Sequence, residues 1–285
     1  MKKLIALLLV AVMAIGLFAG CSVKDNTTTT AAAGDTTAAA DDTTAAADDT
    51  TAAAASFTTI EEGKLIMSTN AAFPPYEMTD DDGNYIGIDV EVATAIAEKL
   101  GLELVIDNME FTAALEAAQQ GKSDMVMAGV TVNEDRLAVM DFSDSYATGI
   151  QVVIVKEGSD VTMDNLGEKM IGTQMGTTGY IYASDTVENG GYGEDHVVAY
   201  DNGITAVQAL MNDQIDAVII DNAPAQAFVD ANEGLTLLDG EWALENYAIG
   251  FAKGNTALVT AVNGALAELI ADGTVQDIVD KYIPA

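Results

Sequence analysis

Apolar and polar positions alternate with two different periods along residues 57 to 285. Short apolar runs predict buried strands at 64–69, 102–107, 125–128, 150–155, 170–174, 197–200, 217–220, 235–238 and 248–252. Apolar residues three or four positions apart predict amphipathic helices at 89–100, 112–120, 204–211, 256–271 and 275–282, and another helix after Thr178. Strands and helices in alternation predict an α/β fold.

Residues 123 to 146 hold the only arginine of the chain, Arg136, although acidic residues outnumber basic ones by 45 to 11. The strand predicted at 125–128 leads into Gly129, Thr131 and Asn133, just beyond a strand's carboxyl end, where open α/β sheets bind ligands. A guanidinium offers two parallel N–H donors that fit a carboxylate. We interpret Arg136 as a carboxylate-binding residue, the alternative being a surface ion pair. The apolar positions after it are expected to return the chain to the core: Leu137, Val139 and Met140.

The first 20 residues have the pattern of a signal peptide. Two lysines precede an apolar run at 4–18, which is too short to remain as a membrane anchor. Cys21, the only cysteine, follows Ala-Gly directly, and this resembles the lipobox of bacterial lipoproteins, although Phe18 stands where that family most often has leucine. The resemblance implies that Cys21 is acylated and becomes the mature N-terminus. The alternative is an ordinary secretory signal followed by a chance cysteine.

Residues 21 to 56 are expected to hold the lipidated cysteine and a disordered tether. They consist almost entirely of Thr, Ala, Asp and Gly, and DDTTAAA repeats in register with GDTTAAA. A coiled coil needs large apolar side chains at repeated positions, and this segment has none. It therefore cannot bury enough surface to offset its ordering entropy, and its flexible-chain reach is roughly 30 to 35 Å.

Deletion of residues 26 to 55 should leave ligand affinity unchanged, because a solvated tether contributes nothing to a site in the folded domain. Calorimetry on the full and the shortened chain would check this expectation. A loss greater than about tenfold, or about 1.4 kcal/mol, would contradict it, since the segment would then have to pack on the domain.

The chain from residue 57 onward is long enough for one large domain or two smaller lobes, and it remains strongly acidic. Nucleic acid and anionic lipid both require a basic patch on the protein, so this charge argues against direct docking on either. An acidic surface favours solubility instead.

Two stretches repeat the same order of features. QQGKSDMVMAG and MNDQIDAVIID each pass from a helix end through a turn to an aspartate and a buried strand, and they end at Gly129 and Asp221. Two similar half-domains facing each other would bring both strand ends to one cleft. Asp221 is interpreted either as an anion for an ammonium group or as the N-cap of the helix that begins there.

Two loops supply further candidates. Gln174, Thr177 and Thr178 lie between a strand and a helix, where backbone N–H groups and hydroxyls can bind an anion. Helix capping alone also explains the threonines, and the Gly-Lys-Thr/Ser ending of a phosphate-binding loop is absent. In NAAFPPYE two prolines exclude helix and leave Phe73 as an aromatic wall, joined by Phe111 of NMEF; the alternative for both rings is the core.

In combination, these motifs resemble the extracytoplasmic solute-binding proteins (family 3 type, lipoprotein form) of polar amino acid ABC importers. The resemblance covers residues 60 to 285 and rests on STNAAFPPYE, GIDVEVATAIAEKLG, NMEF, SDMVMAGVTVNEDR, MDFSDSY, IGTQMGTTGY, IDAVIID and ALAELIADGTVQDIVDKY. It implies a two-lobed α/β fold of the type II periplasmic-binding-protein kind, with two hinge strands near 147–151 and 246–250. Lobe 1 is expected at 57–148 plus 248–285, and lobe 2 at 149–247.

The resemblance also implies how a ligand is held. Arg136 is expected to bind the α-carboxylate of an amino acid, and Asp221 its α-ammonium. The other expected ligand-binding residues are Asn70, Phe73, Phe111, Gly129, Thr131, Gln174, Thr177 and Thr178, of which the two phenylalanines pack on the ligand side chain. The neutral Asn70 argues against a lysine- or arginine-type ligand unless Glu77 or another acid compensates.

The partners implied by the resemblance are an amino acid ligand, ABC permease subunits and, through the lipid anchor, the outer face of the cell membrane of a Gram-positive bacterium. A monomer is expected, with no cofactor, no metal and no nucleic acid. Two alternatives share the fold: an enzyme like some cyclohexadienyl dehydratases, and a sensory ligand-binding domain. An enzyme would need a general acid or base in the cleft, whereas the only histidine, His196, is expected at the surface.

Overall fold

The computed structural model describes residues 56–240 and 243–284. The predictions for the signal peptide, for Cys21 and, apart from residue 56, for the tether lie outside the described residues. Within the described ranges no single helix is long and apolar enough to cross a membrane, and one helix pair bent by 73° passes that test only jointly, by length and composition.

The described elements alternate between strand and helix, as the α/β prediction requires. The strands are β1 (Lys64–Thr69), β2 (Met78–Thr79), β3 (Tyr85–Ile86), β4 (Glu103–Asn108), β5 (Met125–Val126), β6 (Met140–Lys156), β7 (Ile171–Gln174), β8 (Val197–Tyr200), β9 (Ala217–Asp221), β10 (Leu235–Leu237) and β11 (Ala243–Ala252). The α-helices are α1 (Ile88–Leu100), α2 (Phe111–Gln119), α3 (Glu134–Val139), α4 (Thr178–Ser184), α5 (Gly203–Met211), α6 (Asn222–Ala231), α7 (Thr256–Ala271) and α8 (Thr274–Tyr282).

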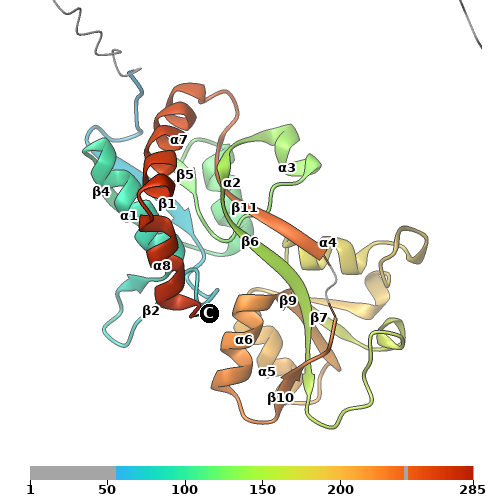
Figure 1. The fold of residues 1–285 in the computed structure, drawn as a ribbon. Helices are drawn as coiled ribbons and strands as arrows, with labels where there is room; N and C mark the ends of the chain where they lie inside the picture. The colour runs from blue at the N-terminus through green and yellow to red at the C-terminus, as the bar shows by residue number, and fades with distance from the viewer. Residues whose placement is uncertain (1–55, 241–242, 285) are drawn as a thin grey trace, which may run out of the picture. The chain divides into compact units, whose positions relative to one another are not determined.

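The main sheet contains two parallel groups of strands, joined by a long antiparallel pair. Its order is β4-β1-β5-β11-β6-β9-β7-β8, with β10 paired to β6. Strands β4, β1 and β5 are parallel to one another, and so are β9, β7 and β8. Figure 1 shows β6 and β11 running side by side from one group to the other, and their register pairs Ala147 with Tyr247 at the middle of the crossing.

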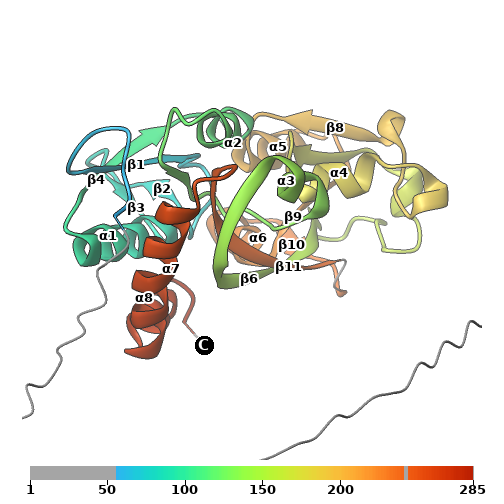
Figure 2. The same ribbon diagram turned by 90° about the horizontal axis from the view of Figure 1, so that it is seen from above.

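Helices cover both faces of each strand group, which explains the continuous apolar runs of the strands. In the first group α1 and α7 bury Leu65 and Met67, whereas α2 packs on Val126 from another cluster. In the second group residues of β6 alternate: Ile154 contacts the cluster under α5 and α6, and Val153 the cluster under α4. Figure 2 shows α1, α7 and α8 at one end of the described fold and α4 at the other.

Most predicted elements have ends within two residues of those observed, but the starts of β6 and β11 and two core positions were predicted wrongly. Strand β11 begins at Ala243 rather than at 248. Strand β6 begins at Met140 rather than 150, because polar residues such as Ser143 and Ser145 occupy its half-exposed first part and hide its period. Strand β5 is only Met125–Val126, shorter than predicted. Leu137 and Val139 are 44% and 49% exposed, so only Met140 returns to the core.

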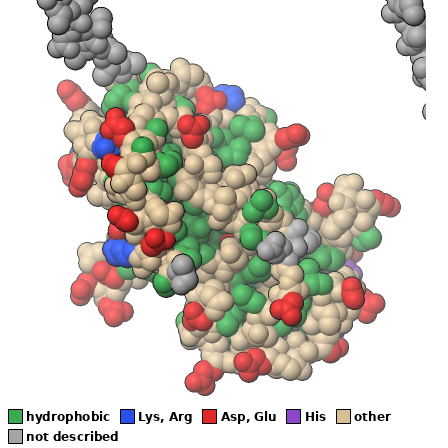
Figure 3. Space-filling model, viewed as in Figure 1, with side chains coloured by type: hydrophobic (Ala, Val, Ile, Leu, Met, Phe, Trp, Pro, Cys, Tyr) green, Lys and Arg blue, Asp and Glu red, His purple; other side chains and the backbone are tan. Residues whose placement is uncertain are grey.

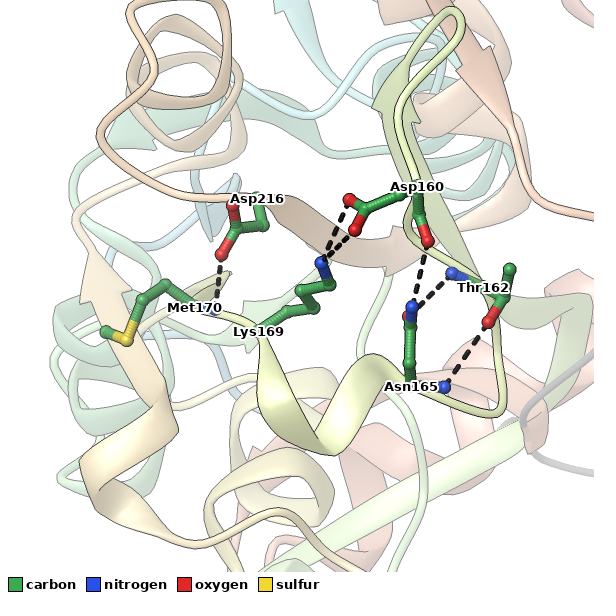
Figure 4. A network of polar contacts seen from close by, with 6 residues as sticks. All are labelled: Asp160, Thr162, Asn165, Lys169, Met170 and Asp216. Atoms are coloured by element: carbon green, nitrogen blue, oxygen red, sulfur yellow. Dashed lines mark hydrogen bonds and ion pairs between the residues drawn. The ribbon is translucent and has the colours of Figure 1, made fainter.

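Polar contacts fix the conformation of the surface segment between β6 and β7. Figure 4 shows the segment between β6 and β7, where Lys169 Nζ pairs with Asp160 Oδ1 at 2.9 Å and Asn165 Nδ2 donates to the Asp160 carbonyl at 2.8 Å. The Met170 N–H donates to Asp216 Oδ2 at 2.8 Å, which fixes the start of β7 beside β9. In Figure 3, Asp and Glu side chains are scattered over the visible face among few Lys or Arg, as the composition predicts.

Candidate functional site

Every residue predicted to bind the ligand lines one cavity. The parallel strands explain this convergence, because Asn70 follows β1, Gln174 ends β7 and Asp221 ends β9. Carboxyl ends of parallel strands meet at one edge of a sheet, and here the edges of both groups face the same space. The cavity lining is Asn70, Phe73, Glu77, Phe111, Ala128, Gly129, Thr131, Arg136, Gln174, Thr177, Thr178 and Asp221.

The position of Arg136 is fixed by hydrogen bonds of its backbone N–H and its guanidinium, and by contact with the Phe111 ring. Asn133 is the N-cap of α3, and its Oδ1 accepts a hydrogen bond from the Arg136 N–H at 2.8 Å. Arg136 is 7% exposed; Nη1 donates to the Thr131 carbonyl at 2.7 Å, and the guanidinium lies 5.4 Å from the centre of the Phe111 ring. None of the ion pairs among the described residues includes Arg136. A buried cation without a carboxylate partner is suited to bind an anionic ligand group.

Glu245 is a buried acidic residue in contact with the cavity lining, and the sequence did not indicate it. Its Oε2 accepts hydrogen bonds from Thr131 Oγ1 at 2.9 Å and from Gln151 Nε2 at 3.0 Å. Burial lowers the pKa of Arg136, and the charge of Glu245 opposes that shift most strongly. Glu245 therefore favours the charged form of the guanidinium without an ion pair. Glu245 lies on β11 between Leu244 and Asn246, which are both exposed, so no pattern in the sequence marked it as buried.

The contacts of Asp221 bear on its two predicted roles, helix N-cap or partner of a ligand ammonium. It is the N-cap residue of α6, yet its side chain forms no capping hydrogen bond. Instead, the Tyr247 hydroxyl donates a short hydrogen bond to its Oδ1. Burial, followed by the charge of Glu245, raises the pKa of the Asp221 carboxyl above its usual range. A ligand ammonium beside Asp221 would favour the charged form again, so the geometry suits an ammonium partner.

Gly129 occupies a position that only glycine fits. Its φ is +54°, and a Cβ there would lie 2.7 Å from the Phe73 ring. Its N–H donates to Asp89 Oδ2 at 2.9 Å, and the Tyr146 hydroxyl donates to Asp89 Oδ1 at 2.6 Å. The Gly129 N–H is thus already used by Asp89, a residue that the sequence analysis missed.

Contacts from both strand groups meet across the cavity. Gln174 Nε2 donates to Asn70 Oδ1 at 2.9 Å, and Arg136 Nη2 donates to the Gly176 carbonyl at 3.1 Å. Thr177 caps α4, with its Oγ1 accepting from the Tyr180 N–H at 3.3 Å, so capping does explain this threonine. The cavity is therefore closed over by residues of the two groups.

His196 does not lie in this cavity. It is half-buried on a short 3-10 helix, Glu194–His196, and lines a separate hollow with Tyr180 and Tyr192. The expectation of a surface residue thus holds only in part, and the only histidine of the chain is remote from the candidate site.

Known proteins resemble this chain over nearly all of its described part. The model of "Bacterial extracellular solute-binding proteins, family 3" matches residues 65–285. The L-cystine-binding protein TcyJ of Escherichia coli K12 is 31% identical over 79% of this chain and 84% of its own. The arginine-binding extracellular protein ArtP of Bacillus subtilis is 30% identical over 77% and 86%.

Solved structures agree with this family assignment. An ancestral arginine-binding protein bound to glutamine is 35% identical, with a TM-score of 0.73 over 79% of this chain and 100% of its own. A mutant of ArgBP from T. maritima is 35% identical, with a TM-score of 0.72 over 78% and 96%. The fold is accordingly the two-lobed, type II periplasmic-binding-protein fold, and the chain belongs to the bacterial extracellular solute-binding proteins of family 3.

Proposed function

We propose that this protein binds an extracellular amino acid between its two lobes and delivers it to the permease of an ABC importer. The observation that carries the proposal is that Arg136 and Asp221 line the same cavity, so that both ends of a zwitterion find an opposite charge. Charge-assisted hydrogen bonds contribute about 1.5 to 3 kcal/mol each. Several of them with an apolar wall can reach the roughly −8 kcal/mol of micromolar binding after association costs.

In this proposal each end of the ligand has its own partners. Arg136 binds the α-carboxylate, with the hydroxyls of Thr131 and Thr178 beside it, and Asp221 binds the α-ammonium. Phe73 supplies an apolar wall. The remaining residues assigned to the ligand are Asn70, Phe111, Gly129, Gln174 and Thr177, which line the same cavity.

The finer features of the proposal come from the sequence and from the family. Lobe 1 comprises residues 57–148 plus 248–285, and lobe 2 residues 149–247, so that β6 and β11 form the hinge. Acylated Cys21 attaches a monomeric protein to the outer face of the cell membrane. The curated relatives described above are named as binding proteins, which supports transport rather than catalysis.

A thermal-shift screen of the ligand-free protein against each of the twenty amino acids tests the proposal directly. A binding protein should be stabilised by at least one of them, because a ligand that binds only the folded state raises the unfolding midpoint. No stabilisation by any amino acid would contradict the proposal.

Binding should also reduce the radius of gyration of the protein. Because Arg136 and Asp221 come from different strand groups, an amino acid that contacts both stabilises the closed form over an open one. Small-angle scattering with and without a binding amino acid measures the change. An unchanged radius, with tight binding shown in the same sample, would mean that the ligand does not select between open and closed forms.

A further inference from the structure

We infer that Tyr247 is a positioning residue for the ligand ammonium: its hydroxyl orients the Asp221 carboxylate and favours the charged form that an ammonium requires. Tyr247 is not among the residues that line the cavity, so it acts on the ligand through Asp221. The inference rests on the proposed function, because it assigns a further residue to the same site and makes binding depend on pH.

Tyr247 is fixed where the two long strands cross. It lies on β11, is 0% exposed, and pairs with Ala147 of β6. An isolated bridge joins its backbone to Thr131 of the cavity lining, and its ring meets the Tyr76 ring edge-on with 5.2 Å between the ring centroids. Backbone and ring are both held, so the position of the hydroxyl is set as well.

Gly149 leaves the room that this hydroxyl occupies. A Cβ on Gly149 would lie 2.1 Å from Tyr247 Oη and 2.9 Å from Asp221 Oδ1. The hydroxyl therefore meets the β6 backbone at a residue without a side chain, and there it donates its hydrogen bond to Asp221 Oδ1. Three strands, β6, β9 and β11, thus combine to build one contact at the edge of the ligand cavity.

The surroundings of Asp221 oppose a negative charge on it. Burial, and then the charge of Glu245, raise the pKa of the Asp221 carboxyl, and the hydrogen bond from Tyr247 is the strongest effect that lowers it. Burial, and then the charge of Asp221, raise the pKa of Tyr247 well above its usual range, so the hydroxyl keeps its proton and remains a donor. The titratable or charged groups that face Asp221 are Glu245 and Tyr247 on β11, Glu77 and Tyr76 in the loop after β1, and Arg136 on α3.

An ammonium that binds beside Asp221 replaces the proton that burial favours there. The complex contains the charged carboxylate, whereas the free protein below the pKa of Asp221 holds the proton, so binding releases a proton. Affinity should therefore rise with pH up to the pKa of the free carboxyl and level off above it. Without the Tyr247 hydroxyl this pKa would lie higher still, and binding would be weakened most at low pH.

Tyr247→Phe tests this role, because it keeps the ring and removes only the hydroxyl. Calorimetry on the full chain would use the amino acid that gives the largest thermal shift among the twenty. At about pH 6 the variant should bind at least about tenfold more weakly than the wild type, and the ratio of the two affinities should fall by at least about threefold on going to about pH 9. A merely structural loss would lower the affinity by the same factor at every pH. Titration of the ligand ammonium is common to both proteins and cancels in the ratio.

Gly149→Ala is an independent second variant, since its methyl group would displace the same hydroxyl from the side of β6. The ratio of wild-type affinity to its affinity should also fall as pH rises. Tyr282→Phe is the matched control: the Tyr282 hydroxyl donates to the Glu91 carboxylate between α8 and α1, and neither residue lines the cavity. Its affinity should stay within about threefold of the wild type at every pH.

An affinity ratio that stays constant over this pH range would overturn the inference and leave the proposed transport function standing. The ratio is read in Tyr247→Phe or, if that variant does not fold, in Gly149→Ala. Wild-type affinity in folded Tyr247→Phe would overturn the inference too, as would an equal pH-dependent loss in Tyr282→Phe. If the wild-type protein binds none of the twenty amino acids, the proposed function itself fails, and the inference fails with it.

Discussion

Replacing Arg136 by lysine should weaken amino acid binding about 30- to 1,000-fold, or about 2 to 4 kcal/mol, although the positive charge remains. An ammonium cannot present two parallel N–H donors to a carboxylate. It would also lose the paired contacts with the Thr131 and Gly176 carbonyls, the second of which helps to close the cavity. Calorimetry with the amino acid found in the thermal-shift screen measures this loss.

The control for this variant is Lys122→Met, which removes an exposed positive charge outside the cavity lining. Its affinity should stay within about threefold of the wild type, because exposed charges are screened by salt. If Arg136→Lys kept wild-type affinity, the carboxylate-binding role of Arg136 would be wrong.

Replacing Gly149 by alanine should lower both affinity and stability. Gly149 lies on β6, where a Cβ would sit 2.1 Å from Tyr247 Oη and 2.9 Å from Asp221 Oδ1. Something must move, and the side chain nearest to the new methyl is the one that holds Asp221. Overpacking of this kind costs about 1 to 3 kcal/mol. We expect a loss of affinity of at least about tenfold and a lower unfolding midpoint, by roughly 2 to 4 °C for each kcal/mol.

Gly264→Ala on α7 is the matched control, since the glycine is exposed and a Cβ there meets no heavy atom within 4 Å. Alanine within a helix should raise stability by about 0.5 to 1 kcal/mol and leave affinity unchanged. Scanning calorimetry and ligand titration of both variants give the comparison. An affinity and unfolding midpoint of Gly149→Ala equal to those of the wild type would show that the hinge tolerates the methyl group.

The periodicity of apolar residues predicted those elements that pack against other elements along their whole length. Helix α7 and strand β8 have the predicted ends, because their apolar positions repeat without interruption. The start of β6 could not be found in this way, since its half-exposed residues include serines and aspartates and its pairing with β11 is long-range. Leu137 and Val139 were wrongly predicted to lie in the core. In a short helix, an apolar residue alone does not indicate which face packs against the rest of the protein.

The cavity lining was predictable where a residue directly follows or ends a strand, as with Asn70 and Asp221. Glu77 was noted only as an acid that could compensate, and its burial is a property of the folded loop. Asp89, Glu245 and Tyr247 were missed because they act on the lining through side-chain contacts between distant segments. No local pattern in the sequence encodes such contacts.

The place of β11 in the sheet affects how the chain can fold. This late strand lies between β5 and β6, so the pairing edges of both earlier strands stay open until residues 243–252 have been made and have entered between them. Non-local pairing of this kind slows folding, and open strand edges are sites of aggregation. A nascent chain released before the last segment, or a truncation before β11, would expose two unpaired edges at the centre of the fold.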